Sequence, residues 1–244
     1  MIDYLDKIRY LEKKERYEKK DLLNPEFELF HDENTHIYYA PHNEYVNTDA
    51  QVMIIGITPG WTQTEIAYRT AKKFIDAGVT KEMIFKKCKY AARFAGSMRG
   101  NLVKMLDKLE LNKYMDLVSS IDLFAEECQL LHKTSLIRYP VFIKGKNYSG
   151  TNPTIFKSKV LSDYVFRYFV PELQRIKKKC LIIPLGKAVE DVLEQLVKDK
   201  IVLEQQCLFG FPHPSGLNAH RIPQFEENKD KLNLKIRSHM ENDK

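Results

Sequence analysis

Cysteine is scarce in this sequence of 244 residues, and no two of its cysteines are close neighbours in the chain. The four are Cys88, Cys128, Cys180 and Cys207. The absence of any Cys-x-x-Cys pair argues against a zinc ribbon, a redox dithiol and a locally assembled iron–sulfur cluster. His-Glu-x-x-His and phosphate-binding Gly-x-x-x-x-Gly-Lys-Ser/Thr motifs are missing too. We therefore expect a site without metal or other cofactor, and free thiols.

Long hydrophobic runs are also missing. No segment approaches the roughly 20 apolar residues that span a bilayer, and the charged N-terminal residues 1–20 do not resemble a signal peptide. We expect no membrane partner and a cytoplasmic protein, associated with the nucleoid if bacterial. Charge is not one-sided: 39 Lys and Arg oppose 33 Asp and Glu, and the net charge of +6 suits a polyanionic partner without requiring one.

The length and composition indicate one main domain. With 244 residues, 43% of them hydrophobic, the chain can bury one full core but is short for two. We expect an N-terminal helical or irregular extension over residues 1–50, an α/β domain over residues 51–236, and a polar tail over residues 237–244 that frays.

Apolar segments typical of buried strands alternate with segments of helical periodicity. The expected strands are residues 51–57, 130–137, 180–185 and 207–211. The expected helices are residues 1–20, 62–77, 101–109, 159–178 and 187–198, with a last helix from Arg221. Residues 24–49 are expected to be irregular or a short hairpin, and residues 139–153 a long loop. This order predicts a three-layer α/β/α fold with a central, mainly parallel four-stranded sheet.

Two short loops follow expected strands and precede expected helices. The first is GITPGWT, residues 56–62, and the second is HPSGLNAHR, residues 213–221. Parallel strands bring such loops to the carboxyl edge of the sheet, where open α/β folds bind ligands. We therefore expect the two loops to form one site. Thr62 and Glu65 have the spacing of a capping box at the start of the helix expected over residues 62–77.

The two loops resemble the signature motifs of the uracil-DNA glycosylase superfamily. GITPG is similar to its first motif, Gly-x-x-Pro-Gly or Gly-x-x-Pro-Tyr, and HPSGLN to its second, His-Pro-Ser-x-Leu or Asn-Pro-Ser-Gly-Leu. RGNLVKML, residues 99–106, and LIIPLGKAV, residues 181–189, resemble the helix and the strand–loop–helix between them, so the likeness covers about residues 51–231. It implies a uracil-DNA glycosylase-like fold and a monofunctional, monomeric DNA glycosylase that flips a base and leaves an abasic site.

The resemblance also implies roles for individual residues. His213 would stabilise the leaving base and Thr58 would orient the attacking water. The expected base-binding residues are Gly56, Ile57, Pro59, Gly60, Trp61, Thr134, Ser135, Asn147 and Tyr148. The expected DNA-binding residues are Lys144, Lys146, Ser215, Gly216, Leu217, Asn218 and Arg221. Alternatives stay open for several of these residues. Trp61 either stacks on a base or packs under the helix, and Leu217 is either a wedge or a core residue. The glycines and Pro59 could form only a tight turn, His213 could be a capped loop histidine, and residues 144–148 could be a solvated loop.

Two positions depart from the family pattern. Most relatives have Asp or Asn where this chain has Thr58, whose hydroxyl is too weakly acidic to act as a general base. Uracil-removing relatives usually have an Asn at the end of the second strand, where this chain has Thr134 and Ser135. A hydroxyl reads fewer groups than an amide. We therefore expect a damaged or modified base other than plain uracil, including a hypermodified base of phage DNA.

Other classes of function remain open at this point. A non-catalytic DNA-binding module of the same fold would recognise a modified base or an abasic site without cleaving it, and His213 would then be dispensable for binding. A protein that serves a small nucleoside or a protein partner would not be retained by DNA.

Overall fold

The central sheet is parallel and has three strands. The computed structural model describes residues 3–93, 97–126, 128–176 and 180–241. Strand β3 (Val52–Gly56) lies between β4 (Leu131–Ser135) and β7 (Leu181–Pro184), in the order β4-β3-β7. All three strands were predicted, and the α/β class is confirmed.

The expected fourth strand at residues 207–211 is reduced to a single bridge. Cys207 pairs in parallel with Ile182, and the Leu208 N–H donates to the Ile182 carbonyl at 2.8 Å. The chain then turns at Gly210, which has a φ of +90°, and Pro212 has no N–H to give. The prediction of a four-stranded central sheet was therefore wrong in this detail.

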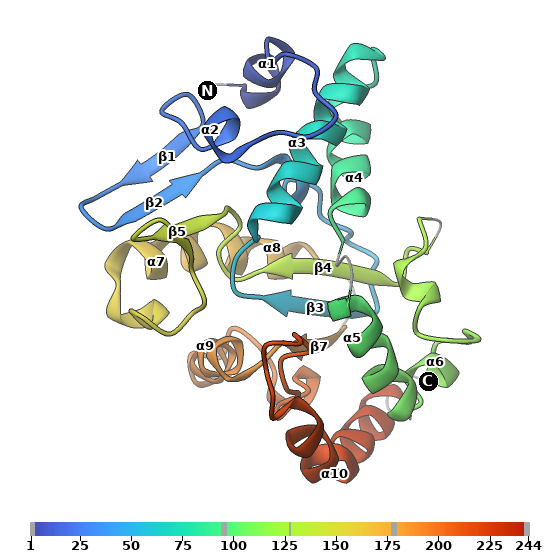
Figure 1. The fold of residues 1–244 in the computed structure, drawn as a ribbon. Helices are drawn as coiled ribbons and strands as arrows, with labels where there is room; N and C mark the ends of the chain where they lie inside the picture. The colour runs from blue at the N-terminus through green and yellow to red at the C-terminus, as the bar shows by residue number, and fades with distance from the viewer. Residues whose placement is uncertain (1–2, 94–96, 127, 177–179, 242–244) are drawn as a thin grey trace.

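Helices cover both faces of this sheet (Figure 1). Met53 and Ile55 face a hydrophobic cluster that includes α3 (Trp61–Asp76), α4 (Lys81–Ala91) and α9 (Lys187–Lys198). Val52 and Ile54 face a second cluster with α5 (Ser97–Lys108) and α10 (Arg221–Glu241). Because side chains alternate between the faces of a strand, burial on both sides explains the unbroken apolar run in β3.

A second, antiparallel sheet has the order β1-β2-β5-β6. Strands β1 (Glu28–His31) and β2 (Thr35–Tyr38) are the short hairpin that was one of the two expectations for residues 24–49. Strands β5 (Val141–Ile143) and β6 (Lys146–Asn147) lie inside the segment expected to be a long loop, so that prediction was wrong. Lys144 and Gly145 join them with φ values of 48° and 74°, which are typical of a two-residue hairpin turn.

The N-terminal fifty residues belong to the core. The expected helix over residues 1–20 is replaced by α1 (Tyr4–Arg9) and the short α2 (Lys19–Leu22), with η1 (Pro41–Asn43) further on. The charged segment between α1 and α2 offers too few apolar side chains to hold a continuous helix against the core. Leu5, Ile8 and Leu22 are nevertheless buried in the same hydrophobic cluster as Met53.

Helix α3 begins one residue earlier than expected. Gly60 is its N-cap, and the Gln63 side chain accepts a hydrogen bond from the Gly60 N–H at 3.3 Å. The Thr62–Glu65 capping box was therefore wrong. Glu65 is buried instead, where it accepts hydrogen bonds from the Tyr17 N–H and the Arg69 side chain.

The remaining helices surround these elements. They are α6 (Leu111–Tyr114), η2 (Asp122–Phe124), η3 (Ile155–Lys157), α7 (Lys159–Tyr164), the π-helix η4 (Val165–Phe169), α8 (Val170–Arg175) and η5 (Glu204–Gln206). The expected helix at 187–198 is confirmed. The one expected at 159–178 is present as α7, η4 and α8 but ends at Arg175, with Ile176 extended, and residues 177 and 178 lie outside the described residues. Helix α10 continues through Glu241, so the expected fraying after Arg237 was wrong for residues 237–241. No helix in the described ranges is long and apolar enough to cross a membrane.

Candidate functional site

Residues of the two loops, 56–62 and 213–221, line one cavity of about 690 Å³ beyond the carboxyl ends of β3 and β7. The first loop contributes Gly56, Ile57 and Thr58. The second contributes His213, Ser215, Leu217 and Asn218. The rest of the lining is Gln63, Met98, Lys133, Ser135, Tyr148, Ser149, Thr151, Leu185, Gly186, Lys187 and Ala188. The structure therefore brings the two loops together, as predicted from the strands expected before them, although the second loop follows a single bridge rather than a full strand.

Side chains of neighbouring elements hold the second loop in place. Asn101 of α5 donates from its Nδ2 to the Pro214 carbonyl at 2.9 Å. Asn218 donates to the His213 carbonyl at 3.2 Å, which closes the loop on itself. These bonds fix the backbone on either side of Pro214, and with it the direction of the His213 side chain.

Gly186 lets the turn after β7 approach His213 closely. It has a φ of +85°, and a Cβ placed on it would lie 2.9 Å from the His213 Cβ. Both the left-handed backbone and the short distance exclude a side chain here. The Gly186 N–H donates to the Phe211 carbonyl at 3.2 Å, so this turn is also joined by its backbone to the segment that leads into the second loop.

The surroundings of His213 favour the neutral imidazole with its proton on Nε2. The Nδ1 atom accepts a hydrogen bond from the Ser215 N–H at 3.2 Å, so the ring proton belongs on Nε2. Burial lowers the pKa of His213 below its usual value of 6.5. A neutral ring with an available N–H donor is the result.

Thr58 is tied to the chain that follows β4. Its hydroxyl donates to the Tyr139 carbonyl at 2.7 Å and accepts from the Val141 N–H at 3.1 Å. The single hydroxyl proton is therefore used inside the protein. One acceptor lone pair remains for another partner, such as a water molecule.

Strand β4 presents Lys133 and Ser135 to the cavity, and Thr134 lies outside its lining. Alternate residues of a strand face opposite sides, so the two that share a side are Lys133 and Ser135. The Thr134 hydroxyl is buried without a hydrogen-bond partner among the described residues. Of the two base-contacting positions expected on this strand, the structure places Ser135 in the cavity and Thr134 away from it.

Sequence reasoning missed Lys133. Its side chain is buried, with 3% of the residue exposed, and burial lowers its pKa from 10.5 to about 8 although the charge of Glu172 acts in the opposite direction. A lysine inside residues 130–137, a segment predicted to be a buried strand, is the signal that could have identified it.

Three expected base-binding residues of the first loop do not line the cavity. They are Pro59, Gly60 and Trp61. Trp61 packs against the hydrophobic cluster around Tyr68, which favours its packing interpretation over base stacking. Gly60 has an ordinary φ of −82°, and a Cβ on it would meet the Asn147 side chain at 3.6 Å, a normal contact.

The expected DNA-binding residues of the second loop lie at the rim. Leu217 is 98% exposed, so its interpretation as a core residue is wrong. Its N–H donates to the Ser215 hydroxyl at 3.2 Å. Gly216 is exposed and lies outside the lining, as does Arg221, which donates to the Asn218 carbonyl at 3.1 Å.

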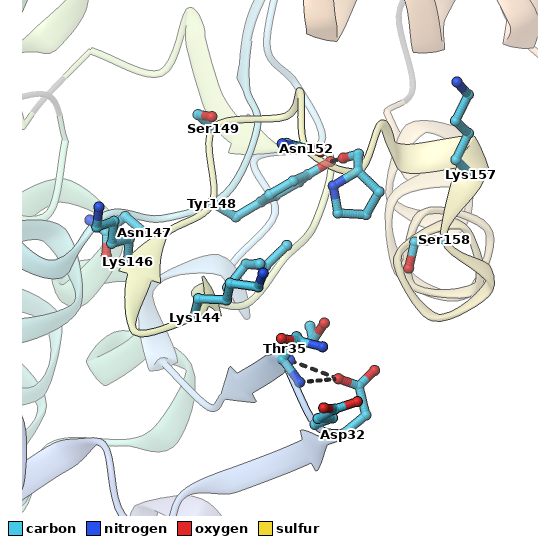
Figure 2. A pocket seen from close by; sticks show the side chains of 14 residues that line it. Asp32, Thr35, Lys144, Lys146, Asn147, Tyr148, Ser149, Asn152, Lys157 and Ser158 are labelled. Atoms are coloured by element: carbon cyan, nitrogen blue, oxygen red, sulfur yellow. Dashed lines mark hydrogen bonds between the residues drawn. The ribbon is translucent and has the colours of Figure 1, made fainter.

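The β5–β6 hairpin lines a neighbouring groove of about 980 Å³ rather than the cavity itself (Figure 2). Lys144, Lys146 and Asn147 belong to this groove, while Tyr148 and Ser149 line both spaces. Tyr148 is buried, and its hydroxyl donates to the Pro153 carbonyl at 2.5 Å. The tyrosine therefore forms a fixed wall between the two hollows.

Gly150 packs the turn after Tyr148 against the first loop. Its φ is +91°, and a Cβ on it would lie 2.7 Å from the Ile57 side chain and 2.9 Å from Ala188.

In the part of the chain that the structure describes, no group of three or more His, Cys, Asp or Glu side chains is placed to hold a metal ion.

Fold and cavity together define the class, an α/β protein with its candidate site at the carboxyl ends of parallel strands. The chain is 44% identical over 236 residues to "Uncharacterized protein YoxB" of Bacillus subtilis (strain 168). The alignment covers 97% of this chain and 91% of that relative, so the chain belongs to the YoxB family. No family model matches the chain, and no solved structure matches it.

Proposed function

We propose that this chain is a DNA N-glycosylase of the uracil-DNA glycosylase superfamily, acting as a monomer. It would hydrolyse the bond between a modified or damaged base and its deoxyribose and leave an abasic site. The observation that supports this proposal most directly is that the GITPG and HPSGLN loops line one cavity at the carboxyl ends of parallel strands. Either motif alone would be weak support, because short turns of this kind recur by chance.

In this proposal His213 donates a hydrogen bond to the departing base. The neutral ring keeps its proton on Nε2, since Nδ1 is occupied by the Ser215 N–H. Such a donor stabilises the negative charge that develops on the base as the N-glycosidic bond breaks. Thr58 contributes by position only, accepting a hydrogen bond from the attacking water with the lone pair that Tyr139 and Val141 leave available.

The residues at the rim of the cavity would contact the DNA. Leu217 fills the gap in the base stack after the target nucleotide has turned out, which its 98% exposure makes possible without loss of core packing. Ser215 accepts from the Leu217 N–H and keeps its hydroxyl proton for a phosphate oxygen. Lys144 and Lys146 would offer positive charges to the phosphates in the neighbouring groove, which Asp32 and Glu33 also line.

The substrate in this proposal is a base other than plain uracil. The residues of β4 that line the cavity are Lys133 and Ser135, and neither has an amide that could both donate and accept. A hypermodified base of phage DNA is one class that fits, and the protein would then act in defence rather than repair.

A strand-scission assay tests the proposal. Purified protein is incubated with duplexes carrying uracil, other lesions or phage-type modified cytosines, and alkali then cuts any abasic site. We expect scission of one substrate, with a loss of about 100-fold or more in His213→Ala. His220→Ala is the matched control, because His220 is exposed, lies in the same loop and does not line the cavity.

A non-catalytic reader of modified DNA is the second candidate, and the engagement of Thr58 favours it. A hydroxyl whose proton is already donated to Tyr139 is a poor means of activating water. Salt-sensitive binding of one duplex without scission, unchanged in His213→Ala, would support the reader. Neither binding nor scission would contradict both DNA functions and leave a nucleoside or protein partner.

A further inference from the structure

Lys133 is a buried cation that borders the cavity. It lies on β4 between His132 and Thr134, which face the other side of the sheet, and its register partner on β3 is Ile54. Only 3% of the residue is exposed, yet it lines the same cavity as His213 and Thr58. Lysine is rarely buried to this extent, because removing an ammonium from water is costly.

The ammonium form predominates near neutral pH. Burial lowers the pKa of Lys133 to about 8, and the charge of Glu172 opposes that effect. At pH 7 the charged form therefore exceeds the neutral amine by roughly ten to one. Because burial keeps His213 neutral, Lys133 provides a positive charge at the inner wall of a cavity whose loop histidine provides none.

We propose that the Lys133 ammonium is the anion-binding group of this cavity and contacts the leaving base directly, as a catalytic residue. This inference rests on the proposed glycosylase function. The C1′–N bond breaks with its electron pair on the base, and a water oxygen forms the new bond to C1′. The proton that this water loses neutralises the base anion after release, while Lys133 keeps its own protons throughout.

The proposal divides the work between two donors of different kinds. His213 offers a neutral N–H from the second loop, and Lys133 offers a full positive charge from the inner wall of the sheet. A buried charge acts more strongly on a developing anion next to it than a neutral hydrogen bond does. Lys133 should therefore matter most for bases that are poor leaving groups.

An excision assay is the first part of the test. On any duplex that the wild type cleaves, Lys133→Met should lower the single-turnover rate about 100-fold or more, with duplex affinity within twofold of wild type. Lys104→Met is the matched control, because it removes one exposed lysine of α5 that lies outside the cavity lining. Lys133→Gln serves as a second variant if the methionine prevents folding. Rates in Lys133→Met equal to wild type would overturn the proposal.

Ligand binding is the second part and does not depend on cleavage. The full chain is titrated at pH 7.5 with 5-nitrouracil, a pyrimidine that forms an anion readily, and with neutral uracil. We expect at least tenfold tighter binding of the anion in the wild type and no preference in Lys133→Met. A preference for the anion without any cleavage of DNA would support the anion site and contradict the glycosylase function. Cleavage of DNA without a preference for the anion, or with a preference that Lys133→Met does not change, would support the glycosylase function and contradict the role of Lys133.

The preference for the anion should decline as the pH rises through about 8. Among the described residues, the charged and titratable groups that act on Lys133 include Glu172 of α8, Lys89 of α4 and His42 of η1, and His213 and Lys187 share its cavity. In Lys133→Met the pH dependence should disappear while these groups remain. Trapping of the wild type on a cleaved duplex by borohydride would instead reveal an imine with a lysine amine, and absence of that adduct in Lys133→Met would overturn the ionic role.

Discussion

Gly186 shows how a single residue positions the site. Two independent constraints act on it, a φ of +85° and a Cβ position only 2.9 Å from the His213 Cβ. Strain in the backbone would affect stability alone. A clash with His213 would also displace the proposed donor to the leaving base.

Gly186→Ala should therefore lower both stability and activity. We expect a loss of more than about 1 kcal/mol in the free energy of unfolding, because an L residue at this φ is strained before the clash is counted. The measurement is urea unfolding combined with the excision rate. Gly78→Ala is the matched control, since Gly78 has a φ of +70° with nothing within 4 Å, and it should be strained without affecting excision. Equal effects of the two variants on excision would contradict the clash with His213.

Thr58 illustrates how a position read as catalytic can also be structural. Its hydroxyl joins the first loop to the Tyr139 carbonyl and the Val141 N–H, just before and at the start of β5. Thr58→Val removes both bonds and leaves two backbone groups without a partner. We expect it to lower the free energy of unfolding by about 1–3 kcal/mol, measured by urea denaturation.

Thr58→Ser is the comparison that separates the two roles. Serine retains the hydroxyl, so stability and excision should both stay near wild type. Wild-type stability in Thr58→Val would show that the two bonds contribute little, and the loop would then need another anchor.

Among the elements, α5 has the most direct connection to the second loop. Asn101 spans the gap with one hydrogen bond to the Pro214 carbonyl at 2.9 Å. Asn101→Ala should cost about 0.5–1.5 kcal/mol in stability and reduce excision further by releasing the backbone next to His213. Lys104→Ala on the same helix is the control, because its side chain is exposed. Unchanged excision in Asn101→Ala, with stability reduced, would show that the loop keeps its geometry without this bond.

Elements with strong periodicity could be predicted from the sequence, and those set by distant partners could not. The apolar run at residues 51–57 is typical of a strand buried on both faces, and residues 187–198 have the periodicity of a helix buried on one face. The β5–β6 hairpin has strands of three and two residues, too short to show alternation, and it forms because β2 offers an edge far away in the sequence. The capping box failed because a helix start shifted by one residue gives the N3 position to Gln63.

The sequence predicted where the candidate site lies but not which side chains of β4 face it. The two loops were expected to meet because each follows an expected strand of a parallel sheet. Which of Lys133, Thr134 and Ser135 faces the cavity depends on a one-residue register that reverses every side chain. That register is fixed by packing on both faces of β4, including the hydrogen bond from His132 to Glu172 at 2.8 Å.

At the scale of the whole molecule, a buried polar network links β4 and the segment that follows it to α8. Glu172 accepts hydrogen bonds from His132 at 2.8 Å and from Arg138 at 3.1 Å. Burial alone would raise the pKa of Glu172, but His132, Lys89 and Arg138 lower it to about 2. His132 Nδ1 accepts from the Asn47 N–H, so its proton lies on Nε2 and the ring is satisfied without a charge. Burial lowers its pKa to about 4.

This network predicts a loss of stability on mild acidification. Between pH 6.5 and about 4 the unfolded chain takes up a proton on His132 and the folded chain does not, so the free energy of unfolding falls as the pH falls. Glu172 adds a second loss as the pH falls from 4.5 to about 2. The His132 contribution amounts to about 2–3 kcal/mol, measured by urea denaturation at pH 7, 6, 5 and 4. In His132→Gln the slope between pH 6.5 and 4 should be correspondingly smaller.

His220→Gln is the control for this last prediction, because it removes an exposed histidine and should leave the slope as it is in the wild type. If His132→Gln and the wild type differed by the same free energy at every pH, His132 would have the same pKa folded and unfolded. Burial of the ring and its attraction to Glu172 would then cancel. His132 would in that case be charged in the folded chain over part of the range from pH 6.5 to 4. The network would then stabilise the fold through its hydrogen-bond geometry and not through a difference in proton uptake.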